Sequence, residues 1–207
     1  MDWPFVSRQS KKRDQIEVID LGGRTTKGIV VRRRGERLSL VSFAFLDAPA
    51  TPGKFSPETL SEHLKHVHRA LNGGRARPVC LALGVNETLF RQVELPLMPV
   101  ADLRQMLKFN GKNYLQQDYP DYVFDCAYCV TNPAASKPAE GAKPAALPQK
   151  QKVLVGGAKK ELIDQMQAAI KLAGLAEDQI VPGVLGPVNA FELAEPDLPE
   201  VEEALVL

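Results

Sequence analysis

The stretch VIDLGGRTTKGIVV, residues 18–31, joins two apolar runs typical of β-strands through a turn that contains glycine, threonine and one lysine. Glycines let backbone amides approach a ligand closely, hydroxyls donate hydrogen bonds, and a lysine adds positive charge, so these residue types suit an anion such as phosphate. The run after the turn is short and β-branched, whereas P-loops and dinucleotide-binding loops lead into a helix. The sequence therefore predicts a phosphate-binding β-hairpin.

The segments around this hairpin predict an α/β protein that opens like a ribonuclease H-like fold. Strands are expected near residues 16–21, 27–34 and 38–46, then a helix over 56–72 and a strand over 79–83. The helix carries its apolar residues on one stripe, and the last strand is short and apolar, as a buried central strand should be. Residues 179–184 predict a further strand that rejoins this sheet, followed by a helix over 187–194.

A second, inserted α+β subdomain is expected over residues 87–175. It contains predicted strands at 88–95, 122–130 and 152–155 and predicted helices at 100–116 and 159–173. Residues 132–151 are rich in Pro, Ala and Lys and predict a flexible excursion between two strands. The main subdomain then consists of residues 15–86 and 176–207, and residues 1–14 form a flexible basic leader.

The composition of the 207 residues narrows the function classes. Lysine and arginine number 26 against 25 acidic residues, so no global field favours nucleic acid or an anionic surface, and any such binding must be local. The cysteines, Cys80, Cys126 and Cys129, are an odd and sparse set that indicates a reducing compartment. No apolar run is long enough to span a bilayer, and the N-terminus lacks a signal-peptide core, which predicts a cytoplasmic protein.

Four pieces, taken in order, resemble the PilM family of type IV pilus assembly proteins, which is actin-like and related to the cell-division protein FtsA. These pieces are IDLG at 19–22 with Lys27, ELPLMP at 94–99 before a helix, VLVGGA at 153–158, and AGL at 173–175. The resemblance covers most of the chain and rests on the order of the pieces. It implies an actin-like half-domain of ribonuclease H-like topology with an inserted small α+β subdomain of the FtsA and PilM type.

The resemblance also implies roles for residues of the hairpin. In the family the hairpin cradles the phosphates of ATP, and its aspartate faces the Mg²⁺ ion. Carried over, Asp20 becomes the metal-facing carboxylate and Lys27 the phosphate-facing cation. The cradle would be formed by Gly22, Gly23, Thr25 and Thr26. Arg24 departs from the family, which places a small residue there. The family's second phosphate loop would follow residue 207, so we expect the first half of a longer protein that binds ATP weakly or not at all by itself.

For partners, the resemblance implies a cytoplasmic scaffold held at the inner membrane by a membrane-anchored protein resembling PilN. In the family the cytoplasmic peptide of that partner docks in a groove between the main and inserted subdomains. No complete catalytic site is evident, so an enzymatic activity is not expected, and neither is binding of nucleic acid.

Two alternatives stay open at the level of sequence. The first is a ribonuclease H-like nuclease or resolvase in which Asp20 and Glu87 hold two metal ions. The second is the cytoplasmic domain of a type II secretion component that has the same fold but binds no nucleotide. His63, His66 and His68 are expected on the solvent side of the first helix and not as metal ligands.

Overall fold

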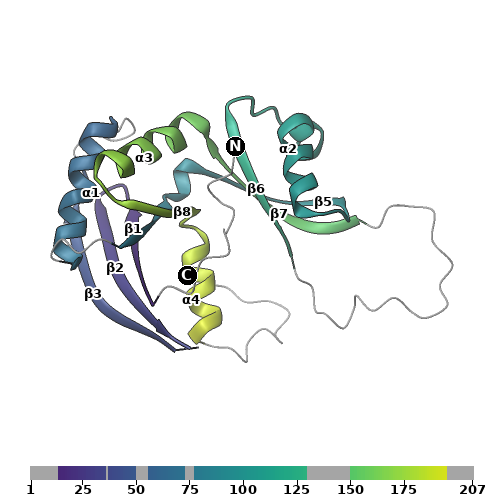
Figure 1. Cartoon of the computed structure of the whole chain (residues 1–207). Helices are drawn as coiled ribbons and strands as arrows, with labels where there is room; N and C mark the ends of the chain where they lie inside the picture. The colour runs from purple at the N-terminus through teal and green to yellow at the C-terminus, as the bar shows by residue number, and fades with distance from the viewer. Residues whose placement is uncertain (1–13, 36, 50–55, 73–76, 130–149, 195–207) are drawn as a thin grey trace. The chain divides into compact units, whose positions relative to one another are not determined.

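A computed structural model describes residues 14–35, 37–49, 56–72, 77–129 and 150–194. The chain divides into two units, one formed by Met1–Thr88 with Glu161–Leu207 and the other by Leu89–Lys160. Each unit has its own sheet (Figure 1). The predicted leader and almost all of the predicted excursion at 132–151 lie outside the described residues.

The first unit is built on a five-stranded sheet in the order β3-β2-β1-β4-β8. Its strands are β1 (Gln15–Leu21), β2 (Thr25–Arg34), β3 (Arg37–Asp47), β4 (Pro78–Leu83) and β8 (Ala176–Pro182). The first three strands form an antiparallel meander, and β4 lies parallel to both β1 and β8. The predicted ribonuclease H-like strand order and the strand that rejoins the first sheet are thus confirmed.

The edge strand β3 contains a β-bulge. Val30 pairs with Ser42 and Val31 pairs with Leu40, so Val41 has no opposite residue on β2. An extra residue of this kind shifts the alternation of side chains along the strand. As a result Leu40 and Phe43, three positions apart, lie on the same face of the sheet.

Helix α1 (Pro57–Asn72) covers one face of this sheet. Its start is capped by Ser56, whose Oγ accepts a hydrogen bond from the amide of Thr59 at 3.2 Å. The predicted apolar stripe is buried: Leu60, Leu64, Val67 and Leu71 are each at most 6% exposed. The helix approaches β2 so closely that a Cβ atom on Gly28 would lie 2.7 Å from Cδ1 of Leu71. Any larger residue at position 28 would therefore force the side chains of Leu71 and Val67 to shift.

Two polar pairs join α1 to the same face of the sheet. His68 Nδ1 lies 2.8 Å from Glu17 Oε2 on β1, and both side chains are buried, at 8% and 0% exposure. His63 Nε2 lies 2.7 Å from Thr26 Oγ1 on β2. The expectation that these histidines face solvent is wrong for His68 and for the half-buried His63, whereas His66 is exposed. The expectation failed because their partners come from strands far away in sequence.

The rest of the first unit comprises helices α3 (Lys160–Leu172) and α4 (Leu185–Ala194) and the short 3₁₀ turn η1 (Val85–Glu87). The buried face of α3 consists of Ile163, Met166, Ala169 and Ile170. The sequence places this helix in the insert that ends at residue 175, whereas in the structure the second unit ends at Lys160. The physical reason is that Leu162 and Met166 lie against the ends of β1 and β4 of the first unit.

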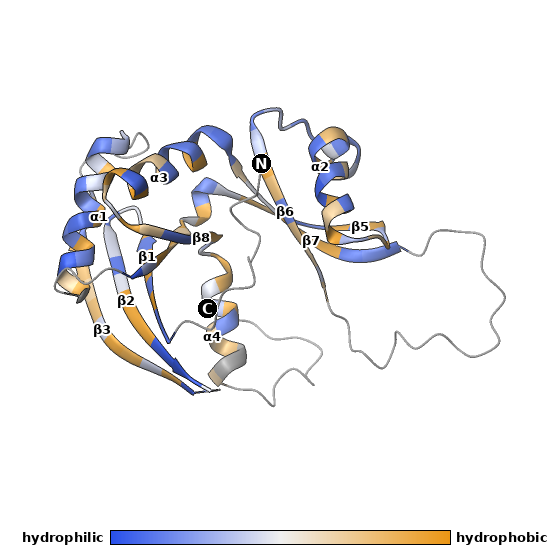
Figure 2. Cartoon of the chain, viewed as in Figure 1, coloured by the Kyte–Doolittle hydropathy of each residue, from blue (hydrophilic) through white to orange (hydrophobic). Residues whose placement is uncertain are grey.

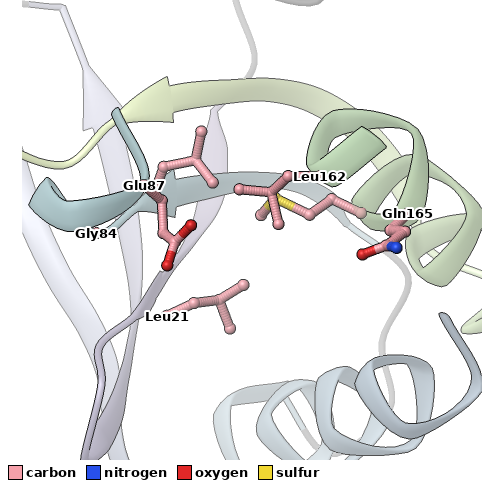
Figure 3. Close-up of a pocket in the computed structure, with 7 residues that line it drawn as sticks. Leu21, Gly84, Glu87, Leu162 and Gln165 are labelled. Atoms are coloured by element: carbon pink, nitrogen blue, oxygen red, sulfur yellow. The ribbon is translucent and has the colours of Figure 1, made fainter. Parts of the chain in front are cut away.

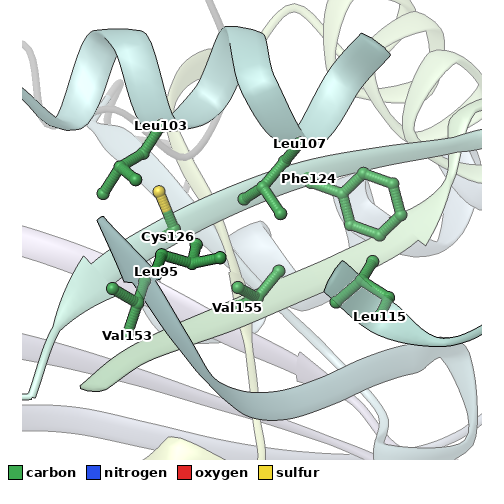
Figure 4. Close-up of a cluster of buried hydrophobic side chains, with 8 residues drawn as sticks. All are labelled: Leu95, Leu103, Leu107, Leu115, Phe124, Cys126, Val153 and Val155. Atoms are coloured by element: carbon green, nitrogen blue, oxygen red, sulfur yellow. The ribbon is translucent and has the colours of Figure 1, made fainter. Parts of the chain in front are cut away.

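The second unit is a three-stranded sheet covered by one helix. It contains β5 (Thr88–Pro96), α2 (Val100–Leu115), β6 (Tyr122–Tyr128) and β7 (Lys150–Lys159), with the strand order β5-β7-β6. Its core consists of Leu95, Leu103, Leu107, Leu115, Phe124, Cys126, Val153 and Val155 (Figure 4). Strand β7 continues to Lys159, four residues beyond the predicted end at 155.

No helix in the described part of the chain combines the length and the apolar character that crossing a membrane requires.

The buried pair of Glu17 and His68 leads to a stability prediction. His68→Leu should lower the free energy of unfolding by about 3–5 kcal/mol, because the Glu17 carboxyl group stays in the core without its imidazole partner. The double variant Glu17→Leu with His68→Leu should recover most of that loss, since apolar side chains of similar volume replace both polar groups. Urea unfolding measures the free energy of unfolding of both variants. His66→Leu on the exposed side of the same helix is the matched control, and equal stability of all three variants would contradict the prediction.

The contact between His63 and Thr26 leads to a prediction about pH. Partial burial, with a smaller contribution from the charge of His66, lowers the pKa of His63 below its ordinary value of 6.5. As the pH falls below 6.5, the unfolded imidazole takes up a proton while the folded one resists it, so the free energy of unfolding should fall. His63→Gln keeps a hydrogen-bonding group but does not titrate, and its stability should depend less on pH between about 7.5 and 5.5. His66→Gln is the control, and an identical pH profile in His63→Gln and the unmodified chain would refute this account.

Candidate functional site

The β1–β2 hairpin forms as the sequence predicts, and its register places Asp20 directly opposite Lys27. Lys27 Nζ lies 3.6 Å from Asp20 Oδ2, with the two side chains 58% and 38% exposed. An ion pair this open to water contributes little to stability. Both groups therefore remain able to turn toward a ligand at little cost in folding free energy.

The turn between the strands is held by its glycine and by the backbone of its arginine. A Cβ atom on Gly22 would lie 2.5 Å from the carbonyl oxygen of Thr25, so only glycine fits there. The carbonyl of Arg24 accepts a hydrogen bond from the amide of Ala48 at 2.9 Å, which ties the turn to the end of β3. Gly23 and the Arg24 side chain are exposed. The turn thus exposes backbone groups and the guanidinium group of Arg24 to solvent, next to Lys27.

The structure does not bring all the predicted phosphate-binding side chains together. Thr26 is fully buried and its hydroxyl is bonded to His63, on the face that α1 covers. Asp20 and Lys27 lie on the opposite face, because neighbouring residues of a strand alternate between faces. Side-chain alternation was visible in the sequence, but the partner of Thr26 was not, since His63 lies 37 residues further along the chain.

The carboxylates proposed for two-metal chemistry also lie in different surroundings. Glu87 ends the η1 turn and lines a pocket together with Leu21, the neighbour of Asp20 on β1. Asp20 lies on the other face of β1, next to Lys27. Among the described residues, no three His, Cys, Asp or Glu side chains are grouped so that they would hold a metal ion. The geometry therefore gives the nuclease alternative no support.

The buried cysteines are unsuited to nucleophilic chemistry. Burial, together with the negative charge of Asp178, raises the pKa of Cys80 to about 11. Burial and the nearby Asp125 raise the pKa of Cys126 to about 11 as well. Both side chains are therefore neutral thiols at physiological pH, whereas a reactive cysteine needs the thiolate.

A pocket that sequence analysis did not identify lies in the first unit, where the carboxyl ends of β1 and β4 meet α3 (Figure 3). Its cavity volume is about 50 Å³. The residues that line it are Leu21, Leu83, Gly84, Glu87, Leu162, Gln165 and Met166. The walls are mostly aliphatic, and Glu87 and Gln165 supply a carboxylate and an amide. No sequence signal reveals such a pocket, because its residues come from three separate segments.

No protein-family model matches the sequence, and no curated protein gives a significant match. Solved structures do show similarity. The chain superposes on a structure described as the PilM-PilN type IV pilus biogenesis complex with a TM-score of 0.65 and 20% identity, over 88% of this chain and 52% of that one. It also superposes on the cytoplasmic domain of EpsL, an inner-membrane component of the type II secretion system of Vibrio cholerae, with a TM-score of 0.51 and 16% identity, over 83% and 58% of the two chains.

The present chain spans little more than half the length of these two solved chains. Similarity at this level of identity concerns the fold. It confirms the α/β half-domain that the sequence predicts, because the chain shares the fold of the PilM-PilN structure over most of its own length.

Proposed function

We propose that this chain acts as an assembly scaffold of a type IV pilus or a related secretion machine and binds a cytoplasmic peptide of a membrane-anchored, PilN-like partner. The observation that carries this proposal is the superposition on the PilM-PilN complex over 88% of the chain. In this proposal the protein works in the cytoplasm and is held at the inner membrane through its partner. Its role is to bind, without catalysing a reaction.

The pocket at the ends of β1 and β4 supplies an anchor site for such a peptide. Peptide recognition depends mostly on a few side chains that enter apolar pockets, while the surrounding contacts contribute less. Leu21, Leu83 and Leu162 offer aliphatic walls for one apolar side chain of the peptide. Glu87 and Gln165 at the same pocket offer polar groups for the peptide backbone or for a basic residue.

A partial ATP site at the hairpin is the second element of this proposal. Lys27 would contact phosphate oxygens, Asp20 would face the Mg²⁺ ion through its carboxylate, and the Gly22–Thr25 turn would supply backbone amides. Thr26 has no part in this site, since its hydroxyl is bonded to His63. The exposure of Lys27 and Asp20 means that phosphate contacts here compete with water, and charges in a high-dielectric setting attract by only about 1 kcal/mol at contact distance.

The similarity to the EpsL cytoplasmic domain supports a second candidate, a type II secretion component that binds no nucleotide. In both candidates the protein is a scaffold. They differ in whether the β1–β2 hairpin binds nucleotide, so a measurement of nucleotide binding distinguishes them.

The pocket leads to a prediction about peptide binding. Leu162→Ala should weaken binding of the cytoplasmic peptide of a PilN-type protein by about tenfold, because it removes one wall of the anchor pocket. Leu172→Ala, on the same helix but 53% exposed, is the matched control and should bind normally. Fluorescence anisotropy of a labelled peptide gives the dissociation constants.

Deleting residues 134–148, which lie outside the described residues, should leave the peptide affinity unchanged. A large loss on this deletion would make that segment a recognition element. Equal affinity of Leu162→Ala and Leu172→Ala would place the peptide elsewhere on the protein.

The hairpin leads to a prediction about nucleotide. In calorimetry with magnesium and ATP, the 207-residue chain should bind weakly or not at all, whereas a form extended to the length of the PilM chain should bind measurably. Lys27→Ala should abolish that binding through loss of the phosphate-facing charge, while Lys108→Ala in the second unit, the control, should not. Tight and equal binding by both lengths would show that the nucleotide site is complete within these residues. Absence of binding in the extended form would favour the nucleotide-free candidate.

A further inference from the structure

Helix α2 of the second unit is interrupted at Asn110. The backbone of this residue has φ −129° and ψ 20°, outside the helical range, so the helix kinks there. The side chain of Asn110 is exposed, and the next residue is Gly111. Asparagine and glycine are both poor helix formers, which accounts for a kink at this pair.

The two parts of α2 on either side of the kink are both anchored in the core of the second unit. Leu103 and Leu107 precede Asn110 and Leu115 follows it, and each is at most 6% exposed. All three belong to the cluster drawn in Figure 4. Figure 2 shows hydrophilic and hydrophobic residues mixed along α2, as expected of a helix that packs one face against a core. Packing on both sides therefore holds the kink in place.

An asparagine followed by glycine reacts with its own main chain. The amide nitrogen of Gly111 loses its proton to hydroxide and attacks Cγ of Asn110, so that an N–Cγ bond forms, the Cγ–Nδ2 bond breaks and ammonia leaves. Water then opens the resulting succinimide ring at either carbonyl and gives aspartate or isoaspartate. In sum, water is consumed and ammonia is released, without an oxidant, a metal ion or an enzyme.

The kink removes the protection that a regular helix gives an asparagine. In an unbroken helix, hydrogen bonds on both sides hold the backbone dihedrals, and closing the ring would break those turns. Asn110 has already left this geometry, and Gly111 has no side chain to hinder the approach of its amide nitrogen. The reacting atoms belong to consecutive residues, so the reaction depends on the backbone of α2 and not on a partner or a bare face.

We propose that Asn110 is a site of spontaneous deamidation, through which the second unit changes as the protein ages. Isoaspartate leads the main chain through the former side chain and lengthens the backbone between Leu107 and Leu115, both of which are fixed in the core. Either product also places a negative charge in the segment that carries Lys108 and Lys112. The modified second unit should therefore be less stable than the original one.

Peptide mapping by mass spectrometry tests the proposal on the intact 207-residue chain, incubated in mildly alkaline buffer. Asn110 should deamidate at least about tenfold faster than Asn113, which is exposed on the same helix but followed by Tyr114, whose side chain hinders the attacking amide. Labelling by an isoaspartyl methyltransferase should identify isoaspartate in the same peptide. Equal rates at the two asparagines would overturn the proposal.

Two variants connect the reaction to these residues. A Cβ atom on Gly111 would lie 3.8 Å from Leu115 Cδ1 and 3.9 Å from Phe124 Cε2, which are ordinary contacts, so Gly111→Ala should fold. Its methyl group should slow the reaction by about tenfold, and an unchanged rate would contradict the mechanism. Asn110→Gln should keep its resistance to urea during an incubation in which the unmodified chain loses some.

Unfolding the chain in guanidinium chloride separates the effect of the kink from that of the sequence. Asn72 is also followed by glycine, so Asn72 and Asn110 should react alike in the unfolded chain, where Asn72 is an internal standard. In the folded chain Asn110 should react within about tenfold of its unfolded rate, because the helical restraint is interrupted there. Reaction at Asn110 in guanidinium chloride but not in the folded chain would show that α2 protects it and would overturn the proposal.

Discussion

The antiparallel register of β1 and β2 is the constraint on which the first unit depends. Pairing Asp20 with Lys27 places Ile19, Thr26 and Val30 under α1 and leaves the ion pair in water. Because side chains alternate, a slip of one residue would put Lys27 beneath the helix and Val30 in solvent. Gly28 reinforces the register, since a larger residue there would displace the side chains of Leu71 and Val67 on α1. The position of the candidate phosphate site thus follows from how the core is packed on the other side of the same strands.

Two polar contacts add specificity to that packing. The Glu17 and His68 pair holds the C-terminal part of α1 against β1, and the His63 and Thr26 contact holds the middle of the helix against β2. Buried polar groups are costly unless partnered, so an arrangement in which either pair is broken is strongly disfavoured. Apolar contacts alone would permit the helix to slide along the sheet. The pocket at the ends of β1 and β4 lies in this same rigid framework, which suits a binding site that must keep its shape.

Local patterns made much of this fold predictable. The strand runs, the turn with Gly22 and the stripe from Leu60 to Leu71 each depend on residues close together in sequence, and the strand order followed from their succession. The burial of Thr26 and of His68 could not be predicted, because each side chain is bonded to a partner from a distant segment of the sequence. The pocket beside Glu87 combines residues from three segments and was not predicted for the same reason. The assignment of α3 to the insert failed because chain order cannot reveal which surface buries Met166.

The bulge at Val41 also lowers the tendency of the protein to aggregate through its sheet edge. Among the described strands, β3 lies at the edge of its sheet, and it reads RLSLVSFAFLD, with charges only at its two ends. A flat edge of that length and composition would be a template for pairing with strands of other molecules and hence for aggregation. The extra residue interrupts the regular outer row of amides and carbonyls and increases the local twist, so an incoming strand finds only short segments with which to pair. The irregularity that aligns the apolar side chains on one face thus also protects the edge that bears them.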